Sequence, residues 1–352
     1  MTSKIIGVGN YIPSKTITNL FFDEHHFINK SGESLKESNA VIANKLKDIT
    51  GIEERRYASD QQVTSDLGLI AAQAAIENSG IDPETLDYII FAHNFGDVRA
   101  GTVQSDAVPS LAARVKHLLR IKNNFCVAYD VLFGCPGWIE GMIQANAFIR
   151  SGIAKRCLVI GAETLSRVVD VHDRDSMIYA DGAGAAILEM SSDESGIKSH
   201  LSASYTLNEK DYLYFGKSYN NDKCQDTKYI KMDGRKIYEF ALVNVPDAMK
   251  KCFDESGYTI DQLSKIIIHQ ANEKMDEAIV KRFYQLYDLP MPENIMPMVI
   301  SKLGNSSVAT IPTLLKMILD GELPAHEIKK GDILLFASVG AGMNVNSFVY
   351  QF

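Results

Sequence analysis

The sequence predicts an α/β protein in which one structural unit is used twice, with helices covering both faces of mostly parallel sheets. Residues 79–91 (SGIDPETLDYIIF) align with residues 256–268 (SGYTIDQLSKIII) at a constant offset of 177 positions, half of the 352-residue chain. A second pair, residues 137–163 and 309–340, follows the same order of helix, Gly turn and buried strand at nearly the same offset. Two pairs that share an offset favour an internal duplication over chance similarity.

Continuous apolar segments alternate with amphipathic helical segments in both halves. Such segments are typical of strands buried on both faces of a parallel sheet, and they occupy residues 88–92, 157–162, 265–269 and 332–337. We therefore divide the chain at 1–190 and 191–352, with the nucleophile described below in the first half. Residues 200–235 are polar, Tyr-rich and irregular, and are expected to form an insertion at the start of the second half.

Composition excludes several classes of protein. The formal net charge of −8 and the absence of a dense Lys/Arg run argue against nucleic-acid binding. The N-terminus lacks the apolar core of a signal peptide, and no apolar stretch approaches the ~20 residues of a membrane span, so we expect a cytoplasmic protein. The five cysteines, at 126, 135, 157, 224 and 252, form no CxxC pair, which predicts free thiols rather than disulfides or a zinc site.

Cys135 lies between glycines in DVLFGCPGWIEGM, residues 130–142. Residues 126–134 predict a buried strand that runs into Gly134, and a helical pattern follows, with Pro136 suited to the first helical position. A thiol on a tight turn at a helix start meets unpaired N–H groups that favour the thiolate. The arrangement resembles a nucleophile elbow with sulfur in place of oxygen. The other four cysteines are interpreted as structural.

His269 and Asn305 are the candidate partners of this thiol. His269 ends a buried strand (KIIIHQAN), at the carboxyl edge where open α/β sheets place their sites. Asn305, in GNSS, precedes Gly321 by 16 residues, much as Cys135 precedes Gly152 by 17, so the repeat brings the amide near the place of the thiol. Taken singly, a structural role in the core explains His269 equally well, and a helix-capping turn explains Asn305.

These stretches resemble the thiolase superfamily, and most closely the beta-ketoacyl-ACP synthase III (3-oxoacyl-ACP synthase III) family. The resemblance covers nearly the whole chain, and the ordered trio of Cys135, HQAN and GNSS is its most specific part. Further motifs that carry it are IIGVGNYIPSKTITN, TGIEERRYA, IGAETLSRVVDVHDRDS, YADGAGAAILE and SVGAGMNVNSFVYQF. The family's fold is a duplicated, five-layered αβαβα arrangement, which is what the internal repeat predicts.

The resemblance implies an acyltransferase of lipid metabolism that makes 3-oxoacyl-ACP in fatty acid biosynthesis by decarboxylative Claisen condensation. Cys135 would take the acyl group from a thioester, and malonyl-ACP would then lose CO₂ and attack. His269 and Asn305 would stabilise the enolate oxygen, while the backbone N–H groups of Cys135 and Ala341 would form an oxyanion hole. No metal or organic cofactor is required.

Departures from the family pattern concern the acyl donor. The family's adenine-binding tryptophan and one arginine fall at Lys45 and Ile49, neither of which is a faithful replacement, whereas Arg174 matches the other adenine-side arginine. An acyl-ACP donor is therefore favoured more strongly than the resemblance alone implies, and both acyl-CoA and acyl-ACP remain candidate donors.

The resemblance also implies partners. Acyl carrier protein would dock on Lys274, Lys281 and Arg282, although a further lysine of the family is replaced by Glu239 and a solvated helix face explains the same residues. A homodimer is expected. The segment 94–110 is longer than the usual loop of the family and is expected to reshape the acyl pocket.

Three alternatives remain open at the level of sequence. An acyltransferase or non-initiating condensing enzyme of secondary metabolism would use the same acyl-cysteine. A papain-like hydrolase also orders Cys, His and Asn along the chain, and would have His269 bonded to the thiol with Asn305 orienting the ring. A non-catalytic partner subunit would have lost the nucleophile, which this chain retains.

Overall fold

Two mixed sheets form the framework of the computed structural model, which describes residues 2–223 and 226–352. The first has the order β1-β7-β6-β4-β5, with bounds Thr2–Tyr11, Asp181–Ser191, Arg156–Thr164, Tyr88–Ala92 and Val127–Val131. The second has the order β11-β12-β13-β8, with bounds Leu263–Ile268, Ile333–Gly340, Asn344–Gln351 and Gly196–Ser204. The strands of each sheet therefore come from one half of the chain.

The two sheets share one topology. In the first, β4 runs parallel to β6, β7 is antiparallel to β6, and β1 is antiparallel to β7. In the second, β11, β12, β13 and β8 repeat those relations in the same order. Within each sheet one strand, β7 or β13, runs opposite to all the others, so both sheets are mixed and most strands of each share one direction, as predicted.

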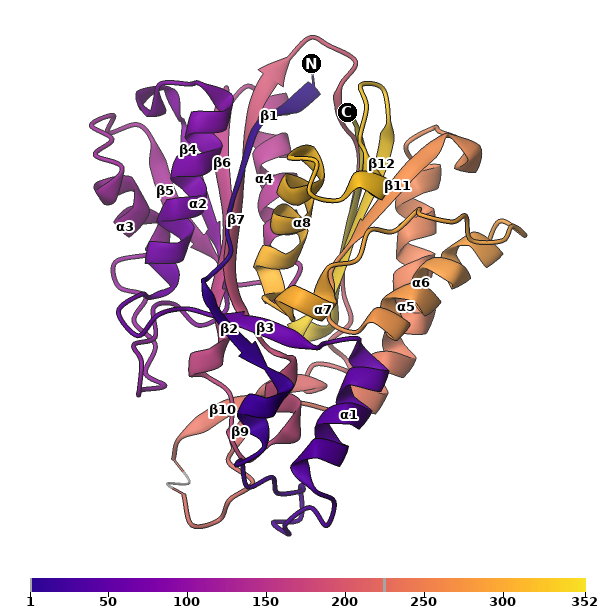
Figure 1. The fold of residues 1–352 in the computed structure, drawn as a ribbon. Coiled ribbons are helices and arrows are strands. Elements are labelled where there is room, and N and C mark those ends of the chain that lie inside the picture. The colour runs from indigo at the N-terminus through magenta and orange to yellow at the C-terminus, as the bar shows by residue number, and fades with distance from the viewer. Residues whose placement is uncertain (1, 224–225) are drawn as a thin grey trace.

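Helices separate and cover the sheets in five layers (Figure 1). Between the sheets lie α4 (Gly137–Arg150) and α8 (Thr310–Leu319), whose side chains share one core with strands of both. The outer face of the first sheet packs on α2 (Thr64–Ser79) and α3 (Leu111–Leu118). The outer face of the second packs on α5 (Gly234–Asp254) and α6 (Glu273–Gln285). The predicted αβαβα arrangement is present.

Repeat-related turns have the same backbone conformation. Gly80 and Gly257, the two Ser-Gly turns of the alignment, have φ of 68° and 80°. Gly152 and Gly321, which follow the two central helices, have φ of 77° and 76°. Only glycine adopts these values without strain, which explains why both copies of each turn carry it.

A smaller region lies below the sheets in Figure 1 and is formed by segments that link strands of the same sheet. It contains β2 (Lys15–Thr18) paired with β3 (Glu54–Tyr57), α1 (Asn39–Thr50), and β9 (Leu213–Lys217) paired with β10 (Lys228–Met232). The short helix α7 (Ile300–Leu303) lies above it. The segment 200–235 is therefore more regular than predicted, because it holds the hairpin β9–β10. Cys224 lies outside the described residues, while Cys126, Cys135, Cys157 and Cys252 are free thiols, as predicted.

Two local predictions need correction. Residues 126–134 do not form a buried strand: β5 covers only Val127–Val131, pairs with β4 alone among the described strands, and is largely half-exposed. Its apolar pattern reflects a sheet edge rather than the interior. Pro136 caps α4 instead of occupying its first position. None of the helices in the described part of the chain is long and apolar enough to cross a bilayer.

Candidate active site

Cys135 lies where the loop after β5 meets the start of α4, and its backbone packs against the end of β12. Gly134 has φ of 67°, and a Cβ there would lie 2.6 Å from the backbone nitrogen of Ala341. A Cβ on Gly340 would lie 2.4 Å from the backbone nitrogen of Cys135. Only glycines allow so close an approach, and they bring together the two backbone donors that the family resemblance implies.

His269 follows directly after β11 and is 3% exposed. Its backbone nitrogen donates to the Ala337 carbonyl at 2.9 Å, which holds it at the carboxyl end of the parallel pair β11–β12. Ring nitrogen Nδ1 lies 2.7 Å from the Thr310 hydroxyl. Burial lowers the pKa of His269 to about 4, so the imidazole is neutral at physiological pH.

Asn305 is held by the backbone on both sides. Its nitrogen donates to the Ile178 carbonyl at 3.0 Å, and its carbonyl accepts from Ala180 at 2.8 Å. The side-chain Oδ1 accepts from the Ser307 backbone nitrogen at 2.8 Å. Because the carbonyl end of the amide is engaged in this way, the Nδ2 hydrogens are the groups that Asn305 presents to a ligand.

Cys135, His269 and Asn305 line one cavity of about 260 Å³, hereafter the inner pocket. Its wall is largely apolar, with Leu165, Leu213, Phe215, Ile230, Val339 and Met343 among the lining residues. The three predicted residues thus converge from both halves of the chain. A nucleophile and two neutral donors facing an apolar cavity can hold a thioester carbonyl and its acyl chain.

The thiol is not ionised at rest, contrary to the prediction from its helix-start position. Burial raises the pKa of Cys135 to about 11, against a lowering by its hydrogen bond with the Ser307 hydroxyl. Loss of hydration in an apolar pocket outweighs the field of a single helix terminus, which contributes about 1 kcal/mol or less at most sites.

Three neighbours of Cys135 escaped the sequence analysis. The Asn94 amide donates to Glu163 Oε1 at 2.6 Å and to the Ser307 hydroxyl at 3.2 Å. Burial raises the pKa of Glu163 to about 8, and its Oε2 has no partner among the described residues. Asn94 follows β4 and Glu163 lies near the end of β6, so the strand-end rule applied to His269 was the signal that could have found them.

A second cavity, of about 620 Å³, adjoins the inner pocket and is called the mouth here. The two cavities share the residues Tyr179, Met232, Ile237, Ala271, Met275 and Asn305. Lys45, Ile49 and Arg174, the three positions compared with the family's adenine site, all line the mouth. Lys45 forms an ion pair with Glu37 there, so neither it nor Ile49 offers an aromatic face to a base.

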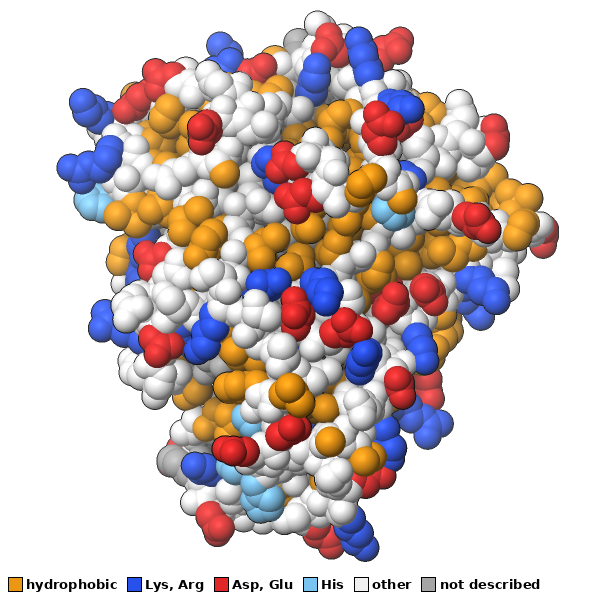
Figure 2. Space-filling model, in the orientation of Figure 1, with side chains coloured by type: hydrophobic (Ala, Val, Ile, Leu, Met, Phe, Trp, Pro, Cys, Tyr) orange, Lys and Arg blue, Asp and Glu red, His pale blue; other side chains and the backbone are white. Residues whose placement is uncertain are grey.

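The predicted docking residues Lys274, Lys281 and Arg282 lie on α6 and are exposed. The same helix begins beside Ala271 and Asn272, which line the mouth. On the face drawn in Figure 2, acidic and basic side chains are interspersed rather than gathered into one field. Any carrier that binds beside the mouth would therefore meet local basic residues on an acidic protein.

The contacts contradict a papain-like arrangement. That arrangement requires Asn305 to orient the ring of His269, whereas Nδ1 of His269 contacts Thr310 and Oδ1 of Asn305 accepts from Ser307. The thiol of Cys135 interacts with Ser307.

Among the described residues, no group of three or more His, Cys, Asp and Glu side chains could hold a metal ion.

Comparison with known proteins places this geometry in a family. The family models for 3-oxoacyl-[acyl-carrier-protein (ACP)] synthase III and for its C-terminal part match residues 129–204 and 253–352. The chain is 31% identical to the beta-ketoacyl-[acyl-carrier-protein] synthase III of Bartonella henselae over 345 residues, covering 97% of this chain and 96% of that protein. It is 32% identical to the one of Neisseria meningitidis serogroup B over 355 residues, covering 99% of each.

Solved structures agree with the sequence relatives. The 3-oxoacyl-[acyl-carrier-protein] synthase III of Aquifex aeolicus superposes with a TM-score of 0.80 at 29% identity, covering 99% of this chain and 100% of that one. The enzyme of Thermus thermophilus superposes with a TM-score of 0.82 at 28% identity, covering 99% of each chain. With its thiolase-like layers and near full-length relatives, the chain belongs to the 3-oxoacyl-[acyl-carrier-protein] synthase III family.

Proposed function

We propose that this enzyme condenses an acyl thioester with malonyl-ACP, with loss of CO₂, to give 3-oxoacyl-ACP in fatty acid biosynthesis. The observation that carries the proposal is the convergence of Cys135, His269 and Asn305 on one apolar pocket behind an open mouth. Family membership supports the same reaction.

In the first half-reaction, Cys135 attacks the carbonyl of the acyl donor. The C–S bond of the donor breaks, a new thioester forms on Cys135, and the thiol proton leaves with the departing thiolate. The oxyanion that forms in between meets the backbone N–H groups of Cys135 and Ala341, which the two glycines hold close together. Because the resting thiol is protonated, ionisation accompanies donor binding or attack.

In the second half-reaction, malonyl-ACP loses CO₂ and leaves an enolate, whose carbon attacks the acyl carbonyl on Cys135. The new C–C bond forms, the C–S bond to Cys135 breaks, and the thiolate that leaves takes up a proton to restore the thiol.

His269 and Asn305 stabilise the enolate oxygen as neutral donors, the first through Nε2–H and the second through Nδ2–H. For Nε2 to carry the proton, Nδ1 must be the unprotonated nitrogen that accepts a hydrogen bond, and the Thr310 hydroxyl at 2.7 Å is placed to donate that bond. The same hydroxyl hydrogen can instead go to the Ser307 carbonyl at 3.0 Å, which corresponds to the other tautomer, so the proposed role of Nε2–H requires Thr310 to donate to Nδ1.

We propose an acyl-ACP rather than an acyl-CoA as the donor. Lys45 and Ile49 replace an adenine-binding pair at the mouth, and only Arg174 there matches the family pattern. The basic residues Lys274, Lys281 and Arg282 would bind the acidic carrier beside the mouth.

The assembly is proposed to be a homodimer. Strand β5 ends the first sheet with one paired side, and Phe125 and Leu132, which flank it, are 90% and 68% exposed. A second copy of β5 would satisfy the open edge and cover these side chains. The division into halves at 1–190 and 191–352 and a cytoplasmic location remain parts of this proposal.

Intact-protein mass spectrometry after mixing with acyl-ACP or acyl-CoA donors tests the proposal. Cys135→Ala is expected to form no adduct, whereas His269→Ala is expected to keep the adduct and lose CO₂ release from malonyl-ACP. Cys126→Ala, which removes a buried thiol away from the pocket, serves as the control. An adduct on Cys135→Ala would overturn the assignment of the nucleophile.

A second assay, which measures CO₂ release and the acyl product, separates condensation from simple acyl transfer. Release of CO₂ from malonyl-ACP that depends on a primer, with a 3-oxoacyl product, is expected. Acylation followed by transfer to another acceptor without CO₂ release would instead identify the secondary-metabolic alternative.

A further inference from the structure

We infer that the stacked rings of Phe95 and Phe215 form the end wall of the acyl pocket and set the longest acyl chain that Cys135 accepts. The inference rests on the proposed function, since it concerns the acyl group carried by that thiol. It gives a role to the segment 94–110, which is expected to reshape the acyl pocket, and to the hairpin β9–β10 within residues 200–235.

The position of the two rings within the cavities is the first step. The thioester reaches Cys135 from the mouth, and residues common to both cavities, such as Tyr179 and Met232, lie on that side. Phe95 and Phe215 line the inner pocket and do not line the mouth. The apolar residues Leu165, Leu213 and Ile230 likewise line the inner pocket and not the mouth. An acyl chain directed away from the mouth therefore extends toward the two rings.

The rings close the pocket by stacking on each other. Their centroids are 4.8 Å apart and their planes differ by 12°. Phe215 lies on β9 opposite Ile230 of β10, lines the inner pocket and is 41% exposed. In this inference the stack is the boundary of the apolar pocket, to which two segments far apart in sequence each contribute one ring.

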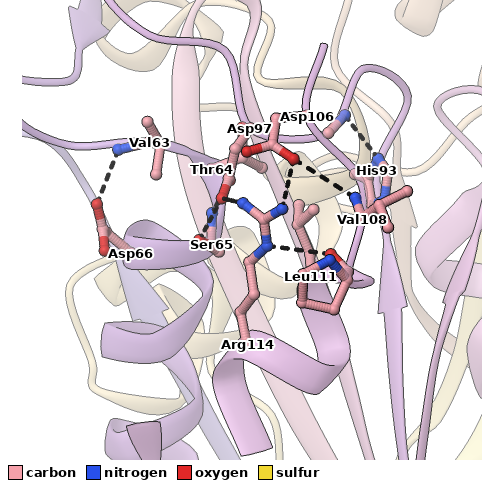
Figure 3. A network of polar contacts seen from close by, with 12 residues as sticks. Val63, Thr64, Ser65, Asp66, His93, Asp97, Asp106, Val108, Leu111 and Arg114 are labelled. Atoms are coloured by element: carbon pink, nitrogen blue, oxygen red, sulfur yellow. Dashed lines mark hydrogen bonds and ion pairs between the residues drawn. The ribbon is translucent and has the colours of Figure 1, made fainter. Parts of the chain in front are cut away.

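The segment that carries Phe95 is anchored, which makes the stack a wall rather than a movable lid. Asp97 accepts from the backbone nitrogen and the hydroxyl of Ser65, both at 2.7 Å. Arg114 on α3 donates to Asp97 and to Asp106, again at 2.7 Å each, and so ties the two ends of the loop together (Figure 3). The Gly96 nitrogen donates to Nδ1 of His93 at 2.9 Å on the other side of Phe95.

Chain length follows from this rigidity. A chain that ends short of the rings gains apolar burial, and so binding, with each added methylene. A longer chain must displace a held aromatic ring or leave the pocket, and close-packed interiors resist such displacement. Replacing either phenylalanine by alanine removes the obstacle and leaves Cys135, His269 and Asn305 unchanged.

The test is a competition among acyl-ACP donors from acetyl to decanoyl, with the adduct on Cys135 measured by intact-protein mass spectrometry. The wild type is expected to discriminate against donors beyond one chain length. Phe215→Ala and Phe95→Ala are expected to improve acylation by the longer donors relative to the shorter ones by roughly tenfold or more. Phe215→Trp is expected to move the limit toward shorter chains. Because this shift is opposite in direction to that of the alanine variants, reduced folding of a variant cannot account for both results.

Leu207→Ala is the matched control, because Leu207 lies in the same insertion and is 91% exposed, outside the inner pocket. Its length profile is expected to equal that of the wild type. If the wild type forms the adduct but the phenylalanine variants keep its length profile, the wall assignment is wrong and the proposed function stands. If no donor acylates the wild type, the proposed function itself fails.

Discussion

The two halves of the molecule place different chemistry at equivalent points of one scaffold. In the first half, Gly134 with φ of 67° precedes Cys135, and α4 follows between the sheets. In the second, Gly304, also with φ of 67°, precedes Asn305, and α8 follows between the sheets. A glycine with the same φ thus precedes a nucleophile in one half and a hydrogen-bond donor in the other.

The difference teaches how a duplicated fold divides a two-step reaction. The half that carries the thiol would bind the acyl group covalently, while the second half adds Ala341 and much of the apolar pocket wall. The amide and imidazole of the second half would stabilise the enolate. The two turns line one cavity but belong to separate segments of the chain. Each turn can therefore be mutated without changing the other, and we expect acylation and condensation to respond separately.

The largest expected effect comes from removing the donor of the second half. Asn305→Ala should leave acylation of Cys135 intact and lower condensation by about 10²–10³-fold, the usual loss for one oxyanion donor. Single-turnover acylation and steady-state condensation, measured on the same preparation, check this. Equal losses of acylation and condensation would contradict the assignment of the two half-reactions to different halves of the chain.

The two glycines sharpen the comparison. In Gly134→Ala the new Cβ would meet the Ala341 backbone at 2.6 Å, so acylation should be lost; in Gly304→Ala it would meet the Arg55 Cβ at 2.7 Å, so condensation should be lost and acylation retained. Each should also lower the free energy of unfolding by about 1–3 kcal/mol through backbone strain. Denaturant unfolding measures that cost.

Gly321→Ala provides the control for these two variants. It has φ of 76° but no atom within 4 Å of the new Cβ, so it should lose stability and keep both half-reactions. Loss of acylation in this variant would show that backbone strain alone, rather than contact with Ala341, explains the loss of acylation in Gly134→Ala.

A smaller effect is expected from Ser307, whose hydroxyl lowers the pKa of Cys135 against the effect of burial. Ser307→Ala should slow alkylation of the thiol by roughly tenfold at a given pH, since hydrogen bonds to charged groups are worth about 1.5–3 kcal/mol. The pH profile of iodoacetamide alkylation should move to higher pH. Ser306→Ala, the neighbouring hydroxyl, should leave the profile unchanged.

The last prediction concerns the pH dependence of stability rather than activity. An unfolded glutamate loses its proton near pH 4.3, whereas Glu163 keeps its proton in the folded protein up to about pH 8. Between these values the native state binds the extra proton, so the free energy of unfolding falls as pH rises, by up to about 1.4 kcal/mol per pH unit. Glu163→Gln should flatten this part of the curve in denaturant titrations, and an unchanged slope would contradict it.

The sequence was a good guide wherever the relevant pattern is local. Apolar runs, Ser-Gly turns and the offset of 177 predicted both sheets and their layers, and strand-end or helix-start positions predicted Cys135, His269 and Asn305. The edge position of β5 was missed because an apolar pattern looks the same at the border of a sheet as in its middle.

Taken alone, the sequence determined the duplicated architecture and the three residues that converge on the pocket, because periodicity and turn chemistry are properties of short segments. Tertiary structure decided the protonation of Cys135, the proton held by Glu163 and the meeting of Phe95 with Phe215. These depend on burial and on contacts between segments distant in the chain, and hydration lost on folding cannot be read from neighbours in sequence.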